Sequence, residues 1–424
     1  MSPLAARRAV AGVLAAAVVA ANVVLVGWAG AQTGPTVPPP TPVPGGSRSP
    51  FPSVLETPRD AGPVPDVAAG SALLADLDDG TVLFRKAATT PRPIASLTKI
   101  MTALVVLTRT SLDDTVRIDP AAVFGRGDFG SGSSLGLRAG ERISVRDLLY
   151  GLLLGSANDA AEALAIHVAG SIGRFVDVMD RRADALGMRD TSFASPHGLD
   201  DRGRSTAEDL LVLMRTAHDD PRFSRIVATR FHVIRSDRGP NRRIQNRNAL
   251  LWLYEGAVGT KTGLTAGAGP CLAAVAGRDG RRLVAIVLDA DGEAFSSAAT
   301  LLNHGFDGFE EATFVRTGDP AGSVELPGGS VPVVAEEGLV AVIPTALADR
   351  VRRTTRVHRS AAFPPAPGER VATLVVSVPG LRIGAVPLVV PEVPPPAPAS
   401  GTWWARGLGA LARAASEAVG GLAD

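Results

Sequence analysis

The sequence predicts an α+β fold in which helices flank one antiparallel sheet and form a helical subdomain, followed by a small all-β domain and a C-terminal amphipathic helix. Three observations predict it. Short apolar runs near residues 71–84 and 256–289 are typical of strands, whereas residues from about 96 to 220 show mainly helical spacing. A helical middle between two strand-forming ends indicates that both ends pair in one sheet. After about Phe309 the pattern changes to short strand-like runs separated by Pro and Gly, which predicts the second domain.

Length and composition indicate how many folded units the chain can form and which partners it is expected to bind. With 424 residues, 46% of them hydrophobic, the chain is long enough for two folded units with sizeable cores. Its net charge is only +1, and no run of Lys and Arg is interleaved with aromatic residues. We therefore expect no nucleic-acid partner.

The cysteine and histidine residues indicate neither a disulfide nor a metal site. Cys271 is the single cysteine and cannot form an intramolecular disulfide, so it is interpreted as a small buried hydrophobe. No two of the six histidines stand at ligand spacing, and no glycine-rich phosphate loop occurs. We therefore expect no metal and no cofactor. His197, which follows Pro196, is expected to make a structural hydrogen bond.

The first 66 residues carry the features of export and of a tether. Arg7 and Arg8 precede an apolar stretch and a small-residue triplet, which is the layout of a secretory signal. Residues 1–31 are therefore predicted to be a signal peptide or, because the apolar stretch is nearly long enough to cross a bilayer, an N-terminal anchor. Both alternatives predict an exported protein at the extracytoplasmic face of the cell membrane or in the cell envelope. Residues 32–66 are predicted to be a Pro-rich disordered linker.

Residues 67–309 are predicted to form the catalytic domain. An Asp-Gly pair at 79–80, between two short apolar runs, indicates a β-hairpin. Apolar residues recur at helical spacing in segments such as 159–166. Two strands, at 271–276 and 283–288, flank a second Asp-Gly turn and are expected to return to the sheet.

Two further segments are predicted after this domain. Residues 310–393 should form the all-β domain, and residues 394–424 a Pro-rich spacer and an amphipathic helix that starts near Trp403. The apolar side chains of this helix fall on one narrow face, with charged side chains roughly opposite. We expect the helix to dock on a membrane surface, and packing on the protein's own surface is the alternative.

Lysine is rare in this chain. Of 43 basic residues only three are lysines, Lys86, Lys99 and Lys261, and all the others are arginines. A position that keeps Lys is a candidate for chemistry that Arg cannot perform, because only Lys can lose its proton near neutral pH.

Lys99 belongs to a Ser-x-x-Lys motif. Residues 91–93, Pro-Arg-Pro, break the chain before an apolar helix, and a spacing of three residues places Ser96 and Lys99 on one helical face. Ser96 is expected in the first turn, where unpaired backbone N–H groups favour a developing negative charge. There Ser96 could be a nucleophile and a neutral Lys99 its base. Taken alone, the motif equally fits a helix cap followed by a solvated lysine.

Two other motifs follow in the chain. Ser156 and Asn158 form a Ser-x-Asn motif in a loop between two helices, which by itself is typical of a helix N-cap. Lys261, Thr262 and Gly263 form a Lys-Thr-Gly motif before the strand at 271–276, which by itself fits a strand end and a turn. The three motifs in this order, on a helix, a loop and a strand, are far more specific than any one of them.

In this combination the chain resembles the serine penicillin-recognising enzymes, and among them the low-molecular-mass penicillin-binding D-alanyl-D-alanine carboxypeptidases. The resemblance runs from about Ser71 to Phe309 and more loosely through the β domain and the terminal helix. Further segments carry it, namely residues 156–161, 186–188, 196–199, 205–210 and 246–251. It implies a serine β-lactamase/penicillin-binding-like fold. It also implies an enzyme that removes the terminal D-alanine from peptidoglycan stem pentapeptides through an acyl-enzyme, with β-lactam antibiotics as covalent inhibitors.

The resemblance implies a role for each motif residue. Ser96 corresponds to the nucleophile, Lys99 to its base, and Ser156 to the proton relay to the leaving amine. Lys261 would assist the relay and draw the substrate's terminal carboxylate, while Asn158 would hold the substrate amide. Thr262 and Gly263 would line the strand edge beside the peptide, and the backbone N–H groups of Ser96 and Leu264 would form the oxyanion hole. Repulsion between the two lysines, with partial burial, is expected to lower one pKa enough to leave a neutral amine.

The chain departs from the family pattern in two places. Leu264 stands where close relatives often have an aromatic residue or His, and residues 289–300 contain no Arg where relatives often carry one. The substrate carboxylate is therefore held either by Lys261 and Thr262 or by an Arg from elsewhere.

Two other functions use the same motifs. A class A-like serine β-lactamase usually has Ser-Asp-Asn and a separate Glu that activates the deacylating water. Here Ala157 replaces that Asp, and no Glu-x-x-Leu-Asn segment lies between Asn158 and Lys261. A catalytically inactive wall-binding scaffold would keep the fold, but all the motif residues are intact. The carboxypeptidase is therefore favoured.

Overall fold

The structure, a computed structural model, describes residues 64–123, 133–292, 294–358 and 363–392. The predicted signal or anchor at 1–31, most of the linker at 32–66, and the spacer and helix at 394–424 lie outside these ranges. No helix in the described ranges is both long and apolar enough to cross a membrane. The chain divides into two compact units between Glu310 and Glu311, and Pro344–Ala346 belong to the first unit.

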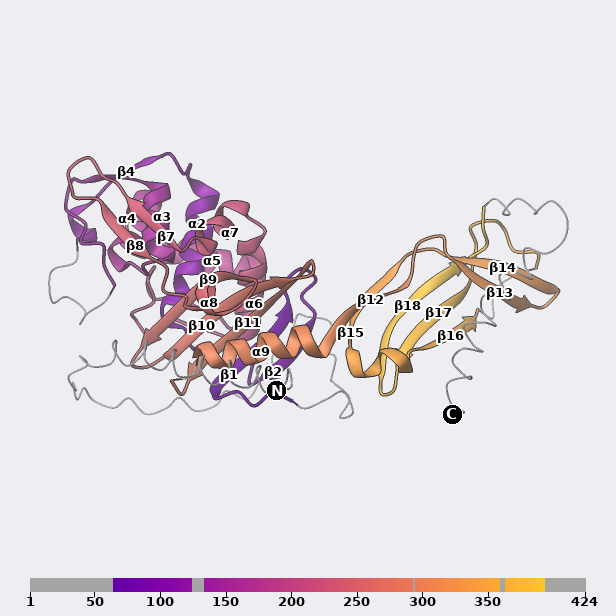
Figure 1. The fold of residues 1–424 in the computed structure, drawn as a ribbon. Helices are drawn as coiled ribbons and strands as arrows, with labels where there is room; N and C mark the ends of the chain where they lie inside the picture. Colours follow the sequence, from indigo (N-terminus) through magenta and orange to yellow (C-terminus); the bar gives the residue numbers. More distant parts are fainter. Residues whose placement is uncertain (1–63, 124–132, 293, 359–362, 393–424) are drawn as a thin grey trace. The chain divides into compact units, whose positions relative to one another are not determined.

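The first unit contains a five-stranded antiparallel sheet (Figure 1). In spatial order its strands are β2 (Val82–Lys86), β1 (Ala69–Asp76), β11 (Arg281–Ala290), β10 (Gly269–Arg278) and β9 (Ala257–Thr265). The N-terminal strand β1 pairs with β11, for example Leu73 with Ile286. The expectation that the two ends of this domain share one sheet is therefore confirmed. Among the strands that the structure describes, β9 lies at the edge of the sheet, with β10 as its one neighbour.

Helices fill the sequence between the hairpin β1–β2 and strand β9 (Figure 1). They are α2 (Thr98–Arg109), α3 (Val145–Leu153), α4 (Asn158–Ala169), α5 (Ile172–Leu186), α6 (Ala207–His218), α7 (Pro221–Ala228) and α8 (Leu250–Leu253), preceded by the 3₁₀ turn η1 (Ala95–Leu97) and supplemented by η2 (Pro120–Ala122). Helix α9 (Ala294–Gly308) follows the last strand of the sheet. Helix α2 is the central one, since every side chain from Thr98 to Leu107 is buried.

Three short two-stranded sheets interrupt the helical region. They are β3 (Arg92–Pro93) with β6 (Arg204–Ser205), β4 (Thr115–Arg117) with β5 (Arg142–Ser144), and β7 (Phe231–Ile234) with β8 (Arg242–Gln245). Their strands have two to four residues, too few for the alternation of apolar and polar residues to stand out in the sequence. One of them, β3, directly precedes the 3₁₀ turn η1.

In its described residues the second unit consists of strands and part of one short 3₁₀ turn, η3 (Thr345–Arg350), whose first two residues belong to the first unit. Strand β12 (Phe309–Val315) pairs with β15 (Leu339–Pro344). A five-stranded sheet has the order β13 (Pro320–Leu326), β14 (Gly329–Ala335), β18 (Leu381–Val389), β17 (Arg370–Val378) and β16 (Arg352–Val357). A separate core that includes Val333, Val371 and Leu388 stabilises this unit, which confirms the predicted small β domain.

Candidate active site

Ser96 and Lys99 lie at the start of the central helix. The expectation for Ser96 needs a refinement, because the residue lies in the 3₁₀ turn η1 directly before α2 and not in α2 itself. A 3₁₀ turn has three residues per turn, so positions i and i+3 are nearly eclipsed. Lys99 Nζ is accordingly 2.9 Å from Ser96 Oγ. Ala95, at the start of the turn, has a φ of 46°, a strained value for a residue other than glycine.

The Lys99 amine is buried and surrounded by oxygen acceptors. Its Nζ lies 2.9 Å from Ser96 Oγ, 2.8 Å from Asn158 Oδ1 and 2.7 Å from the His197 carbonyl oxygen. The side chain has no solvent exposure. Burial lowers the pKa of Lys99 well below its ordinary value, and the positive charges of Lys261 and Arg247 lower it further. A neutral amine has one lone pair and two N–H donors, so it can accept a proton from Ser96 while still donating to the other two oxygens.

Ser156 lies in the loop between α3 and α4, and Asn158 at the start of α4 contacts this amine. The N-cap interpretation of this motif is wrong: the N-cap of α4 is Ala157, which supplies no side-chain cap. Asn158 is the first helical residue, and its Oδ1 accepts from Lys99. Ser156 has a φ of 60°, outside the region that residues with a Cβ prefer. Backbone strain of this kind is often kept where it positions a functional side chain.

Lys261 brings the edge strand β9 into the same site. Its Nζ lies 3.0 Å from Ser156 Oγ and 2.7 Å from the Thr262 carbonyl oxygen. The Lys261 side chain is buried, and burial together with the charge of Arg247 lowers its pKa to about 7. Lys99 and Lys261 thus contact Ser96 and Ser156, respectively, at the centre of one site.

The three residues after Lys261 belong to strand β9 and lie beside the 3₁₀ turn that carries Ser96. Thr262 and Gly263 are half-buried, whereas Leu264 is 66% exposed. A Cβ at Gly263 would lie 3.1 Å from both Ser96 N and Ala95 Cβ. Glycine at this position therefore lets β9 approach the turn that carries Ser96.

His197 helps to build the wall of the site. Its Nδ1 accepts a hydrogen bond from Leu199 N at 3.1 Å, and its Nε2 lies 3.3 Å from Glu162 Oε1. Its carbonyl oxygen is one of the three acceptors around Lys99 Nζ. Burial lowers the pKa of His197. These contacts agree with the structural hydrogen bond that was expected for this residue.

Arg247 is a site residue to which the sequence analysis assigned no role. Its guanidinium makes no hydrogen bond or ion pair with any described residue. The residue is exposed as a whole, but partial burial of the guanidinium lowers its pKa. Its positive charge lowers the pKa of both Lys99 and Lys261. In the sequence, the feature that could have pointed to Arg247 is its place between two asparagines, Asn246 and Asn248. Both asparagines are buried, and the Asn246 side chain makes hydrogen bonds with backbone groups.

Arg92 also lies near this end of the sheet, but its guanidinium already donates hydrogen bonds to other groups of the protein. Nη1 lies 2.6 Å from Asp289 Oδ2, Nε lies 2.8 Å from Ser71 Oγ, and Nη2 donates to the Gly70 carbonyl oxygen. Of these two arginines, Arg247 is the one with donors available to an incoming anion.

The fold and the site define a class of enzyme. A serine hydroxyl beside a buried, deprotonatable lysine on a mixed α+β scaffold is the arrangement of an active-site-serine enzyme that uses lysine as its base. Residues 58–292 match the model of the peptidase S11 family, described as D-alanyl-D-alanine carboxypeptidase. The chain belongs to this family.

Individual relatives agree with this membership. The D-alanyl-D-alanine carboxypeptidase DacB2 of Mycobacterium tuberculosis is 37% identical over 257 residues, which are 59% of this chain and 86% of that protein. DacC of Escherichia coli is 34% identical over 351 residues, 77% of this chain and 84% of the relative. The crystal structure of penicillin-binding protein 6B from Escherichia coli, 31% identical, superposes with a TM-score of 0.64 over 80% of this chain and 99% of that one. The resemblance, the fold class and the serine peptidase activity are thereby confirmed, and the carboxypeptidase is supported over the β-lactamase and the inactive scaffold.

Proposed function

We propose that this protein removes the terminal D-alanine from peptides that end in D-Ala-D-Ala, through an acyl-enzyme on Ser96. The observation that carries the proposal is the 2.9 Å contact between Ser96 Oγ and Lys99 Nζ. Because the Lys99 pKa is well below its ordinary value, the amine can be neutral at physiological pH. A neutral amine at hydrogen-bond distance is what a serine needs to become a nucleophile.

In the acylation step, Ser96 Oγ attacks the carbonyl carbon of the penultimate D-alanine while its proton passes to Lys99. The carbonyl oxygen becomes an oxyanion, which the backbone N–H groups of Ser96 and Leu264 stabilise. The C–N bond to the terminal D-alanine then breaks, and its nitrogen takes a proton from Ser156. Lys261, 3.0 Å from Ser156 Oγ, supports that transfer and replaces the proton.

In the deacylation step, a water molecule attacks the ester carbon of the acyl-enzyme. The proton that Lys99 gained in acylation first returns to Lys261, which gave one up through Ser156. Lys99 then takes one proton from the water and gives it to Ser96 Oγ, which leaves as the alcohol, and the shortened peptide departs as a carboxylic acid. The same base thus serves both halves of the reaction. A β-lactam has an amide in a four-membered ring that Ser96 would open in the same way, so β-lactam antibiotics are expected to be covalent inhibitors.

Substrate binding divides between two sides of the site. The Asn158 carboxamide would hold a substrate amide, and Thr262 and Gly263 would line the free edge of β9 along which the peptide lies. For the terminal carboxylate we propose Lys261 together with Arg247, since the guanidinium of Arg247, an exposed residue, has no partner among the described residues. This proposal supplies the Arg that residues 289–300 lack.

We also propose that the enzyme is exported and acts on peptidoglycan stem peptides at the outer face of the cell membrane. The apolar stretch and small-residue triplet at 1–31 support export, and the segment from Trp403 to Asp424 supports membrane-surface docking. The domain division proposed with it is 67–309 for the catalytic domain, 310–393 for the β domain and 394–424 for the spacer and helix. A chain starting at Thr33 should co-sediment with lipid vesicles, and deletion of 403–424 should release it. Equal sedimentation with and without the helix would leave 1–31 as the anchor.

One assay separates the three candidate functions. The purified protein is incubated with a soluble peptide ending in D-Ala-D-Ala, with a chromogenic cephalosporin, and with a fluorescent penicillin. A carboxypeptidase releases D-alanine and keeps the penicillin label, whereas a β-lactamase turns the cephalosporin over rapidly. A protein that neither labels nor releases D-alanine would be the inactive scaffold, and the proposed function would be wrong.

A further inference from the structure

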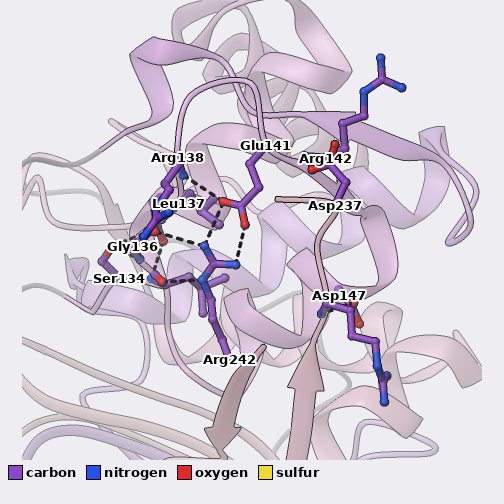
Figure 2. A network of polar contacts seen from close by, with 12 residues as sticks. Ser134, Gly136, Leu137, Arg138, Glu141, Arg142, Asp147, Asp237 and Arg242 are labelled. Carbon is purple, nitrogen blue, oxygen red and sulfur yellow. Dashed lines mark hydrogen bonds and ion pairs between the residues drawn. The ribbon is translucent and has the colours of Figure 1, made fainter. Parts of the chain in front are cut away.

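A buried ion pair lies outside the site described above. Glu141, just before β5, is 1% exposed, and its two carboxylate oxygens lie 2.7 and 2.9 Å from Nη1 and Nη2 of Arg242, the first residue of β8. Figure 2 shows the two side chains pointing toward each other. The contact with Arg242 is two-pronged, the geometry in which Arg–carboxylate pairs are strongest. Hydrogen bonds from Arg242 hold the pKa of Glu141 below its ordinary value against the opposing effect of burial, so the carboxylate stays ionised.

Arg242 also binds the backbone of residues 133–137, called here the 133–137 segment. Its Nε donates to the Leu135 carbonyl oxygen at 2.9 Å. Its Nη2 donates to the carbonyl oxygen of Gly136, which is labelled in Figure 2, at 3.2 Å. Glu141 closes the turn that follows, because its Oε2 accepts from Arg138 N at 3.0 Å. Glu141 thus holds Arg242 in the one orientation that reaches both carbonyls.

The 133–137 segment in turn caps helix α4, which carries Asn158. The Asn158 N–H donates to the Ser133 carbonyl oxygen at 2.7 Å. The buried carboxylate of Asp159 accepts from Ser134 Oγ, Leu135 N and Leu137 N, at 2.6, 3.0 and 3.1 Å. Because the N-cap residue Ala157 has no capping side chain, the Ser133 carbonyl oxygen supplies the acceptor for the first N–H of the helix, and the Asp159 contacts tie the 133–137 segment to the same end of α4.

We propose that Glu141 and Arg242 are positioning residues for catalysis, which fix the Asn158 carboxamide against Lys99 through the 133–137 segment. Neither residue touches the reacting atoms. Asn158 Oδ1 is 2.8 Å from Lys99 Nζ, so a shift at the start of α4 changes both the substrate-amide contact and an acceptor of the base. Displacements of about 1 Å in such a group can lower a rate by about 100-fold. The inference rests on the proposed function.

The test compares Glu141→Gln with a matched control. Glu208 is also buried, 3% exposed, and pairs with Arg85 at 3.1 Å in the same unit, but none of its contacts reaches Asn158. For both variants, kcat and KM for a D-Ala-D-Ala peptide and the melting temperature are measured well below unfolding. We expect Glu141→Gln to lower kcat/KM about 10- to 100-fold, mainly through kcat. Glu208→Gln should change it less than about twofold at a comparable loss of melting temperature.

Two additional measurements keep the test decisive. If Glu141→Gln does not fold, Arg242→Lys takes its place, since a lysine keeps the charge opposite Glu141 but has three donors on one nitrogen, which cannot reproduce the four contacts made by Nε, Nη1 and Nη2 of Arg242. Amide hydrogen exchange at Asn158 should become faster in either variant and remain unchanged in Glu208→Gln. A kcat/KM within twofold of wild type, or unchanged exchange at Asn158, would overturn the inference. If the wild-type enzyme released no D-alanine, the proposed function would fail, and the exchange measurement alone would decide whether the pair positions Asn158.

Discussion

Lys99 Nζ and Asn158 Oδ1 are 2.8 Å apart, although the two residues are separated by 59 positions in the chain. The contact joins the second residue of α2 to the first residue of α4. The same amine also contacts Ser96 Oγ, at 2.9 Å. This places the proposed base between the nucleophile and the group that would hold the substrate amide.

The hydroxyl of Ser96 should be indispensable for both covalent reactions. Ser96→Ala is expected to abolish penicillin labelling and D-alanine release, because a single oxygen forms the acyl-enzyme. The melting temperature should stay near the wild-type value. Gel fluorescence after incubation with a fluorescent penicillin checks the labelling, and labelling that persisted would place the nucleophile elsewhere.

Arginine should not replace lysine at position 99. Lys99→Arg is expected to lower acylation nearly as much as Lys99→Ala, by about 10²- to 10⁴-fold, because a guanidinium keeps its proton at neutral pH and cannot act as the base. Rates of penicillin acylation in the two variants measure this directly. An Lys99→Arg enzyme that kept a tenth of wild-type acylation would contradict the base role.

Lys261 should make the stability of the fold depend on pH. Burial and the charge of Arg247 lower its folded-state pKa to about 7, whereas an unfolded chain has a lysine pKa of about 10.4. Between these values the unfolded chain binds a proton that the folded chain lacks, so the free energy of unfolding rises with pH. The slope from this one group is at most about 1.4 kcal/mol per pH unit.

Denaturant unfolding of the wild type and of Lys261→Met, from pH 6 to pH 10, checks that pH dependence. The stability of the wild type minus that of the variant should rise from about pH 7 toward pH 10 and be flat below. A difference that stayed constant over the whole range would mean that Lys261 has an ordinary pKa in the folded protein.

Arg247 should contribute to recognition of the substrate carboxylate. Arg247→Gln is expected to lower kcat/KM for a free D-Ala-D-Ala peptide by about 10- to 100-fold, the loss that corresponds to a charge-assisted contact of about 1.5–3 kcal/mol. A peptide with a C-terminal amide is the control, since it has no carboxylate to lose. An equal effect on both peptides would show that Arg247 acts on the amines and not on the carboxylate.

Spacing along the chain was sufficient to find the principal site residues. Ser96 and Lys99 are three residues apart, so almost any helical turn brings them together. The Ser-x-Asn and Lys-Thr-Gly motifs added the loop and the strand, and the apolar runs predicted that both ends of the domain share a sheet. These features depend on local periodicity and on the chemistry of single residues, which the sequence states directly.

Other features depend on how distant segments pack. Lys261 reaches Ser156 across 105 positions only because β9 is the edge strand next to the turn that carries Ser96. No local pattern predicts the positive φ of Ser156, the absence of a partner for the Arg247 guanidinium among the described residues, or the buried pair of Glu141 with Arg242. The free energies of burial and of charge interaction depend on distances in space, so the depressed lysine pKa values are properties of the folded protein. Motif order thus identified the chemistry, and tertiary packing decided how the two lysine pKa values are lowered, which arginine has no partner among the described residues and which segment contacts the start of α4.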